Sequence, residues 1–120
     1  MYAAKDRATI ACQIYQPPTA VGGLVGDPEL LLDSRLMTPL YPLGDDSQRY
    51  SFESGRRVRQ TYIFAEDDVD WQFVDAIDAG MTLRETVSGE EHLIRMAEAW
   101  VGFRNGHKFM RLFVETVRGS

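Results

Sequence analysis

Hydrophobic and polar positions alternate in three segments of the chain, and each segment is predicted to be a β-strand. Small or apolar residues alternate with polar ones over residues 7–15. Residues 56–64 alternate in the same way and are rich in β-branched and aromatic side chains. The same period of two recurs at 81–87, and 108–117 has the composition of a strand. Because this period is typical of strands with one buried face, the chain is expected to be mainly β.

Proline and glycine interrupt the pattern in the first half of the chain. Residues 16–28 hold three prolines and three glycines, too many breakers for regular structure, and are expected to form a long exposed loop. Residues 29–43 are apolar but contain Pro39 and Pro42, which predicts an irregular strand that is short or lies at a sheet edge. Turn residues open a second loop at 44–55. Long loops in small domains are often binding elements.

An acidic segment at 66–80 fits two structures. Residues 66–78 carry six acidic side chains and no basic one. Apolar side chains recur every four residues from Val69 to Ile77, and Asp70 is placed to act as an N-cap, which predicts a short helix. The alternative is an acidic turn that crosses between two strands.

Residues 88–101 also leave two structures open. A serine and a glutamate at the start of this segment have the spacing of a capping box, and apolar residues from Leu93 to Trp100 recur at helical intervals. These signals predict a helix. The Asn-Gly pair at 105–106 instead favours a tight turn, and a strand just before it would make 92–117 a hairpin.

Length, composition and charge limit the class of protein. The 120 residues match one domain, expected to span 1–120, and a hydrophobic fraction of 44% permits a packed core. A net charge of -5 argues against bulk electrostatic capture of nucleic acid. Cys12 is the single cysteine, so no intramolecular disulfide is expected. No apolar run is long enough for a bilayer and the first residues do not resemble a signal peptide, so the chain is expected inside the producing cell.

No residue pattern in the sequence predicts catalysis, and the chain is expected not to be an enzyme. A nucleophile paired with a base, a metal-ligand cluster and a phosphate-binding glycine loop are all missing at the proper spacing. His92 and His107 are interpreted as ordinary surface or interface histidines that flank the hairpin. The acidic segment lacks the spacing of a calcium loop and is interpreted as a solvated face. Neither a cofactor nor a metal is expected.

Arg56, Arg57 and Arg59 form the basic cluster of the sequence. Alternation along the predicted strand places Arg57 and Arg59 on one face. Guanidinium groups suit a phosphate backbone or a carboxylate patch on a partner, so the cluster is a candidate contact surface. Pairing with neighbouring acids on an exposed strand face is the alternative.

Several short motifs follow one another in an order found in one protein family. The first strand contains Arg-Ala-Thr-Ile at 7–10, a Gly-Gly pair follows at 22–23, and a Pro-Leu element follows at 38–43. A strand of the type Arg/His-x-Tyr-x-Ile is matched at 59–64, and the last strand is matched at 111–117. In this order the chain resembles the small head–tail connector proteins of tailed bacteriophages, the head-closure or stopper family.

This resemblance implies a small antiparallel β-barrel with long loops and at most one or two short helices. It implies a structural virion protein of the phage neck, assembled in the host cytoplasm, that closes the head after DNA packaging and provides the docking surface for the tail. The implied partners are further copies of the chain in a six- or twelve-fold ring, a portal or adaptor protein above, and a tail-terminator or tail-tube protein below. Packaged DNA would pass through the channel without sequence-specific binding, and no membrane is involved.

Loops and charged residues are the expected contacts of such a ring. Loop 16–28 and segment 44–55 are expected to touch neighbours on the portal side or the tail side, or the channel. The residues assigned to partner or channel contacts are Gly22, Gly23, Asp45, Asp46, Arg56, Arg57, Arg59, Glu66, Asp67 and Asp68. The last three begin the acidic segment, whose negative charge would repel DNA phosphates and let the genome pass.

Two other classes of function compete with this one. A small acidic inhibitor or immunity-type protein would cover a basic surface of its partner with the acidic segment. A small α+β enzyme or ligand-binding domain would pack helix 88–101 on a sheet, with His92 or His107 in a pocket.

Overall fold

The structure is a computed structural model that describes residues 7–17, 20–21, 24–25, 28–42, 58–101 and 108–118. The second loop at 44–55 and the Asn-Gly turn predicted at 105–106 lie outside these residues.

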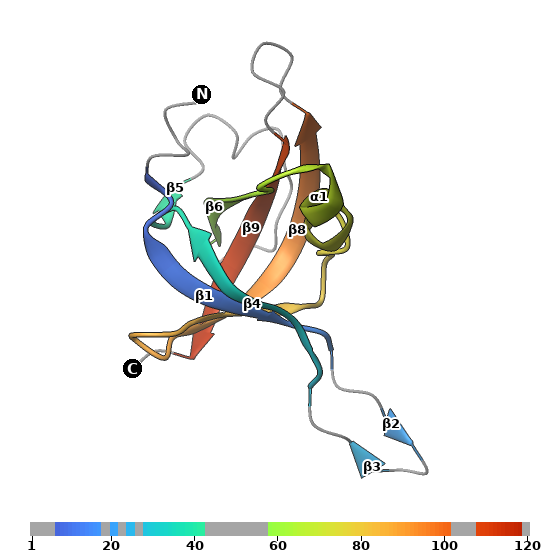
Figure 1. The fold of residues 1–120 in the computed structure, drawn as a ribbon. Coiled ribbons are helices and arrows are strands. Elements are labelled where there is room, and N and C mark those ends of the chain that lie inside the picture. The colour runs from blue at the N-terminus through green and yellow to red at the C-terminus, as the bar shows by residue number, and fades with distance from the viewer. Residues whose placement is uncertain are drawn as a thin grey trace.

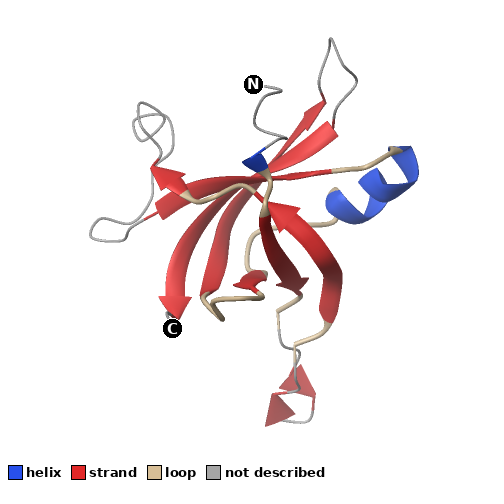
Figure 2. Cartoon of the chain, turned by 60° about the vertical axis from the view of Figure 1, so that its left-hand side comes forward, coloured by secondary structure: helices blue, strands red, loops and turns tan. Residues whose placement is uncertain are grey.

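Seven antiparallel strands form one sheet that closes on itself (Figure 1, Figure 2). The strands are β1 (Ile10–Tyr15), β4 (Leu30–Met37), β5 (Tyr41–Pro42), β6 (Val58–Phe64), β7 (Thr82–Glu85), β8 (Glu91–Val101) and β9 (Lys108–Arg118). Their order is β4-β1-β7-β8-β9-β6-β5, and a further pairing of β4 with β6 joins Met37 to Ile63 and completes a ring. The predicted mainly β fold, an antiparallel sheet closed as a small barrel, is confirmed.

Residues that point into the ring form the core. Ile14 of β1, Leu83 of β7 and Leu112 of β9 are each fully buried at 0% exposure. The single α-helix among the described residues, α1 (Asp68–Val74), lies beside the ring and adds Val74 to this core, and Ile77 just behind the helix joins it (Figure 2). Burial of these apolar side chains is the main force that holds the helix against the sheet.

Irregular pairing bends the strands and lets the sheet close. The register of β1 against β4 shifts on both sides of Ile14, and Ser34 in this part of β4 adopts a left-handed φ of 54°. The register of β8 against β9 shifts between Ile94 and Met96. An extra residue on one strand increases local twist and bends that strand, which is how barrels turn their corners.

Two buried threonines complete the closure where β4 ends beside β6. The backbone N–H of Thr38 donates to the carbonyl of Tyr62 at 3.2 Å, and the N–H of Tyr62 donates to Thr38 Oγ1 at 3.0 Å. The hydroxyl of Thr61 lies 2.7 Å from the Thr38 carbonyl and 2.9 Å from Thr38 Oγ1. This Thr38–Thr61 pair extends the β4–β6 pairing beyond the backbone register.

Strands β1, β6, β7 and β9 lie where the sequence predicts them, with ends that differ by a few residues. The first loop and the segment after it are more regular than predicted. Two-residue strands β2 (Ala20–Val21) and β3 (Leu24–Val25) pair within 16–28. Strand β4 has eight residues and pairs on both sides, because both prolines of 29–43 follow its end and remove no donor from it.

The acidic segment contains a helix, as one of its two interpretations predicts, but the predicted cap is wrong. Asp67 is the N-cap, and its Oδ1 accepts the N–H of Asp70 at 2.7 Å. Asp70 lies inside the helix and is buried together with Val74, whereas Val69 and Phe73 are 67% and 52% exposed. With seven residues, α1 is too short to cross a membrane, and the described part of the chain holds no helix that is long and apolar enough.

Residues 91–101 form strand β8, so the helix predicted for 88–101 is wrong and the hairpin interpretation is confirmed by the β8–β9 pairing. The cause of the helical signal is the irregularity at Arg95. On the two sides of Arg95, Ile94 and Ala97 face the core side of the sheet, because they pair with Val114 and Leu112 of β9. Leu93 and Met96 both face the other side of the sheet in the same way. Residues on one face are therefore three positions apart at the irregularity, instead of two, and a spacing of three is also typical of a helix.

Candidate functional site

Four of the residues assigned to partner contacts are described by the structure: Arg59, Glu66, Asp67 and Asp68. The other six, Gly22, Gly23, Asp45, Asp46, Arg56 and Arg57, lie outside the described residues. The four described residues do not share one site. The three acids surround the start of α1, whereas Arg59 lies on β6 and contacts β9.

The acids at the start of α1 are exposed, but two of them also have structural roles. Asp67 caps the helix, and Asp68 Oδ1 lies 3.0 Å from Lys108 Nζ at the start of β9. The Asp68 side chain is 91% exposed, so this ion pair is well solvated and contributes little to stability. Glu66, Asp67 and Asp68 thus present negative charge to solvent beside one end of β9.

Asp70 does not belong to this exposed acidic surface, because it is buried and forms an ion pair with Arg35 of β4. Both guanidinium Nη atoms donate to the two carboxylate oxygens, and the N–H of Glu66 donates to Asp70 Oδ2 at 2.9 Å. Hydrogen bonding to Arg35 holds the pKa of Asp70 below its ordinary value, against the opposing effect of burial. The same bond raises the pKa of Arg35. This pair ties α1 to the ring.

A second polar cluster lies inside one end of the barrel and contains His92. The imidazole is fully buried, so the expectation of a surface histidine is wrong, and His107 lies outside the described residues. His92 Nε2 lies 2.6 Å from Glu85 Oε2, and His92 Nδ1 lies 2.8 Å from Thr116 Oγ1. Arg59 Nη2 in turn donates to Thr116 Oγ1 at 2.8 Å. A hydrogen-bonded row therefore crosses β6, β9, β8 and β7.

Glu90 adds a second carboxylate to this cluster. Its Oε2 lies 3.9 Å from His92 Nε2, and its side chain is 35% exposed. The turn between β7 and β8 delivers Glu90 to this position, because Gly89 adopts a left-handed φ of 78° and its N–H donates to the carbonyl of Glu85 at 2.9 Å. The oxygens of Glu85 and Glu90 and the nitrogen of His92 all lie within 4.8 Å of one another.

Cys12 borders this cluster on β1, directly across from Glu85 in the β1–β7 register. Burial, with a smaller contribution from the negative charge of Glu85, raises the pKa of the Cys12 thiol to about 12, so the thiol stays protonated. A protonated, buried thiol is a poor nucleophile and a poor metal ligand. Cys12 therefore acts as a core side chain.

The row Glu85–His92–Thr116 contains the three group types of a nucleophilic triad, but its geometry does not suit one. The hydroxyl of Thr116 already accepts a hydrogen bond from the guanidinium of Arg59. The His92 ring is fully buried by the strands, so no substrate could reach it. The arrangement is better suited to holding a positive charge between two carboxylates. No sequence motif predicts this cluster, because Glu85 and His92 are brought together only by the pairing of β7 with β8.

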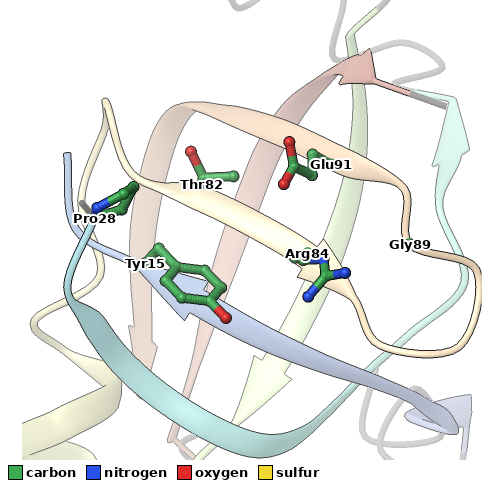
Figure 3. Close-up of a pocket in the computed structure, with 6 residues that line it drawn as sticks. All are labelled: Tyr15, Pro28, Thr82, Arg84, Gly89 and Glu91. Carbon is green, nitrogen blue, oxygen red and sulfur yellow. The ribbon is translucent and has the colours of Figure 1, made fainter. Parts of the chain in front are cut away.

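An open pocket lies on the outer face of the same strands (Figure 3). Its volume is about 470 Å³. It is lined by Tyr15, Pro28, Thr82, Arg84, Gly89 and Glu91. Figure 3 shows the side chains of Arg84 and Glu91 on the two neighbouring strands β7 and β8, with the Tyr15 ring on β1. The pocket mixes polar and apolar side chains and brings together no nucleophile with a base.

The hairpin of β2 and β3 extends away from the barrel (Figure 1). At its base, the N–H of Gln16 donates to the carbonyl of Glu29 at 2.7 Å, which continues the pairing of β1 with β4. The base of the hairpin is therefore fixed to the ring. The sequence predicts a binding loop here, and the two short strands β2 and β3 lie apart from the ring.

Comparisons with protein-family models, with curated proteins and with solved structures find no match for this chain.

Proposed function

We propose that the chain is a structural protein that assembles with copies of itself and with neighbours through loops attached to a rigid barrel. Within that class, we propose a head-closure protein of the neck of a tailed bacteriophage. Its ring lies below the portal or adaptor, retains the packaged DNA and accepts the tail. In this function the chain performs no catalysis and needs no cofactor.

The observation that supports this proposal most is the β2–β3 hairpin, which projects from a closed barrel (Figure 1). A sheet that closes in a ring holds its shape, while a hairpin fixed at Gln16 and Glu29 offers the backbone edges of β2 and β3 to a neighbour. This arrangement fits a subunit that docks onto a preformed ring. It agrees with the order of motifs by which the sequence resembles the connector family.

Exposed apolar side chains give a second reason to propose contacts with other subunits. Val69 and Phe73 on α1 are 67% and 52% exposed, and Leu36 on β4 is 52% exposed. Subunit interfaces bury side chains of this kind at their centres. The neighbouring acids at the start of α1 would remain at the rim of such a contact or face the channel.

The inhibitor alternative receives less support from the geometry. It requires the acidic segment to be available for a basic partner, but Asp70 is bound to Arg35 and Asp67 caps α1. Asp68 is also paired with Lys108. Half of the acidic side chains of the segment thus have partners within the chain.

Binding to portal rings, compared between the full chain and a variant that lacks the hairpin, tests the proposal. In the variant, residues 17–28 are replaced by a two-residue Asn-Gly turn, which the Gln16–Glu29 hydrogen bond allows. The control variant keeps the hairpin and changes Arg84 to Gln in the outer pocket. We expect the full chain and the control to bind and the hairpin variant to remain folded but unbound.

Electron cryo-microscopy of purified particles of a phage that encodes the chain provides the second test. Density for a cyclic ring between portal and tail is the expected result. Absence of the chain from particles, together with a discrete soluble partner, would refute the neck function.

A further inference from the structure

Three side chains of types that can bind a metal converge at one end of the barrel. Glu85 is the last residue of β7, Glu90 ends the turn, and His92 is the second residue of β8. Their ligand atoms, two carboxylate oxygens and His92 Nε2, lie within 4.8 Å of one another. The short connection between β7 and β8 and the strand ends beside it thus supply one nitrogen ligand and two oxygen ligands.

We propose that Glu85, Glu90 and His92 bind a divalent transition-metal cation, with Zn²⁺ as the best fit. Imidazole and carboxylate are both good Zn²⁺ ligands, and three protein ligands leave a fourth tetrahedral position open. Mg²⁺ and Ca²⁺ fit less well because they prefer a shell made only of oxygen. This site does not depend on the proposed neck function, since it rests on residues inside the barrel of one chain.

Hydrogen bonds from neighbouring side chains hold the His92 ring in an orientation that suits such a cation. Thr116 Oγ1 lies 2.8 Å from His92 Nδ1 and is itself fixed by Arg59 at 2.8 Å. A ligand histidine is usually oriented by a hydrogen bond from its other nitrogen, which also fixes the tautomer. In the tautomer that carries its proton on Nδ1 and donates it to Thr116, the lone pair of Nε2 points at the two carboxylates.

Without the cation, a proton occupies the place between His92 and Glu85. The 2.6 Å separation of His92 Nε2 from Glu85 Oε2 is that of a strong hydrogen bond, which requires a proton on one of the two atoms. On binding, the cation takes the Nε2 lone pair and a Glu85 oxygen, and this proton leaves to solvent. The Glu90 side chain, 35% exposed, offers the path by which the cation enters.

Titration of the untagged full chain with Zn²⁺ by isothermal calorimetry tests the proposal, with Mg²⁺ as the comparison ion. We expect saturable binding of a single Zn²⁺ per chain, proton release into buffer, and much weaker binding of Mg²⁺. The informative variant is Glu90→Gln, because Glu90 is partly exposed and its loss leaves the Glu85–His92 hydrogen bond in place. Its Zn²⁺ affinity should fall at least about tenfold.

Two controls separate this site from adventitious binding. Glu91→Gln changes the adjacent glutamate, which lines the outer pocket instead, and His107→Gln removes the other histidine. Both variants should bind Zn²⁺ with unchanged affinity. Imidazole nitrogen NMR should show Zn²⁺ shifting Nε2 of His92 while Nδ1 keeps its proton. Absence of saturable binding, a Glu90→Gln variant that binds as tightly as the original chain, or an unmoved His92 signal would each overturn the proposal.

Discussion

The pair formed by Arg35 and Asp70 joins helix α1 to the ring through charge-assisted hydrogen bonds. The two side chains are 18% and 11% exposed, so solvent weakens their attraction only in part. Asp70→Asn keeps the shape but loses the charge, and we expect the free energy of unfolding at pH 7 to fall by about 2 kcal/mol. Urea denaturation measures this change, and the double variant with Arg35→Gln isolates the coupling between the two residues.

The same pair predicts a difference in acid stability. The pKa of Asp70 is lowered in the folded chain, so its contribution is present above the ordinary carboxyl pKa of about 4 and is lost as pH falls through the lowered value. The original chain should therefore lose more stability on acidification than Asp70→Asn. Equal acid profiles for the two proteins would show that Asp70 does not carry this linkage.

The roles of individual polar residues were the hardest feature to predict. Asp67 and Asp70 are both acceptable N-caps by type, and only the three-dimensional position of Arg35 decides which one is drawn into the interior. His92 is buried because β7 and β8 bring Glu85 against it, and that register follows from the turn at Gly89. One-dimensional spacing contains neither piece of information.

At the scale of elements, uniform alternation was a reliable guide and irregular pairing was not. Strand β9 is regular, with Met110, Leu112 and Val114 in the core at every second residue, and its β-branched and aromatic composition predicted it. Strand β8 contains the irregularity at Arg95, and its pattern imitated a helix. Strand β4 was hard to predict for a similar reason, because two register shifts and the left-handed backbone of Ser34 interrupt the alternation of its buried and exposed residues.

The N-terminus of α1 offers a direct test of element stability. Asp67→Ala removes the side chain that accepts the N–H of Asp70, and we expect the free energy of unfolding to fall by about 1 kcal/mol. Asp67→Asn should retain most of the stability because asparagine also caps helices. Asp68→Ala is the matched control with a smaller effect, since that side chain is 91% exposed.

Thermal unfolding of the four proteins by circular dichroism provides this comparison. A loss for Asp68→Ala as large as that for Asp67→Ala would assign the effect to general charge at the helix start and not to the cap.

At the scale of the whole molecule, closure of the ring rests on few hydrogen bonds. Thr38→Val preserves volume but leaves the buried N–H of Tyr62 without its acceptor and removes a partner of Thr61. We expect a loss of about 2 kcal/mol in urea denaturation and faster hydrogen exchange at the Tyr62 amide. Thr9→Val, at an exposed position before β1, is the control and should be neutral. An unchanged Tyr62 exchange rate would contradict this account of closure.

The acidic surface at the start of α1 belongs to the proposed function of the assembled ring. The triple variant Glu66→Gln, Asp67→Asn and Asp68→Asn removes three negative charges while it preserves a capping side chain. If these acids repel DNA in the channel, ejection of the genome should slow in particles that carry the variant. Unchanged genome retention and ejection would contradict a channel-facing position of the acidic surface.

Closure of the ring also limits how this protein can join others. Open strand edges invite a further strand, which is the common route both to aggregation and to docking by strand addition. In the described part of the chain, the strand next to the closure is β5, which has only two residues and ends on Pro42, a residue without an N–H to offer. Among the described residues, the β2–β3 hairpin keeps backbone edges outside the ring, so a partner that recognises this hairpin by adding a strand would bind away from the closed sheet.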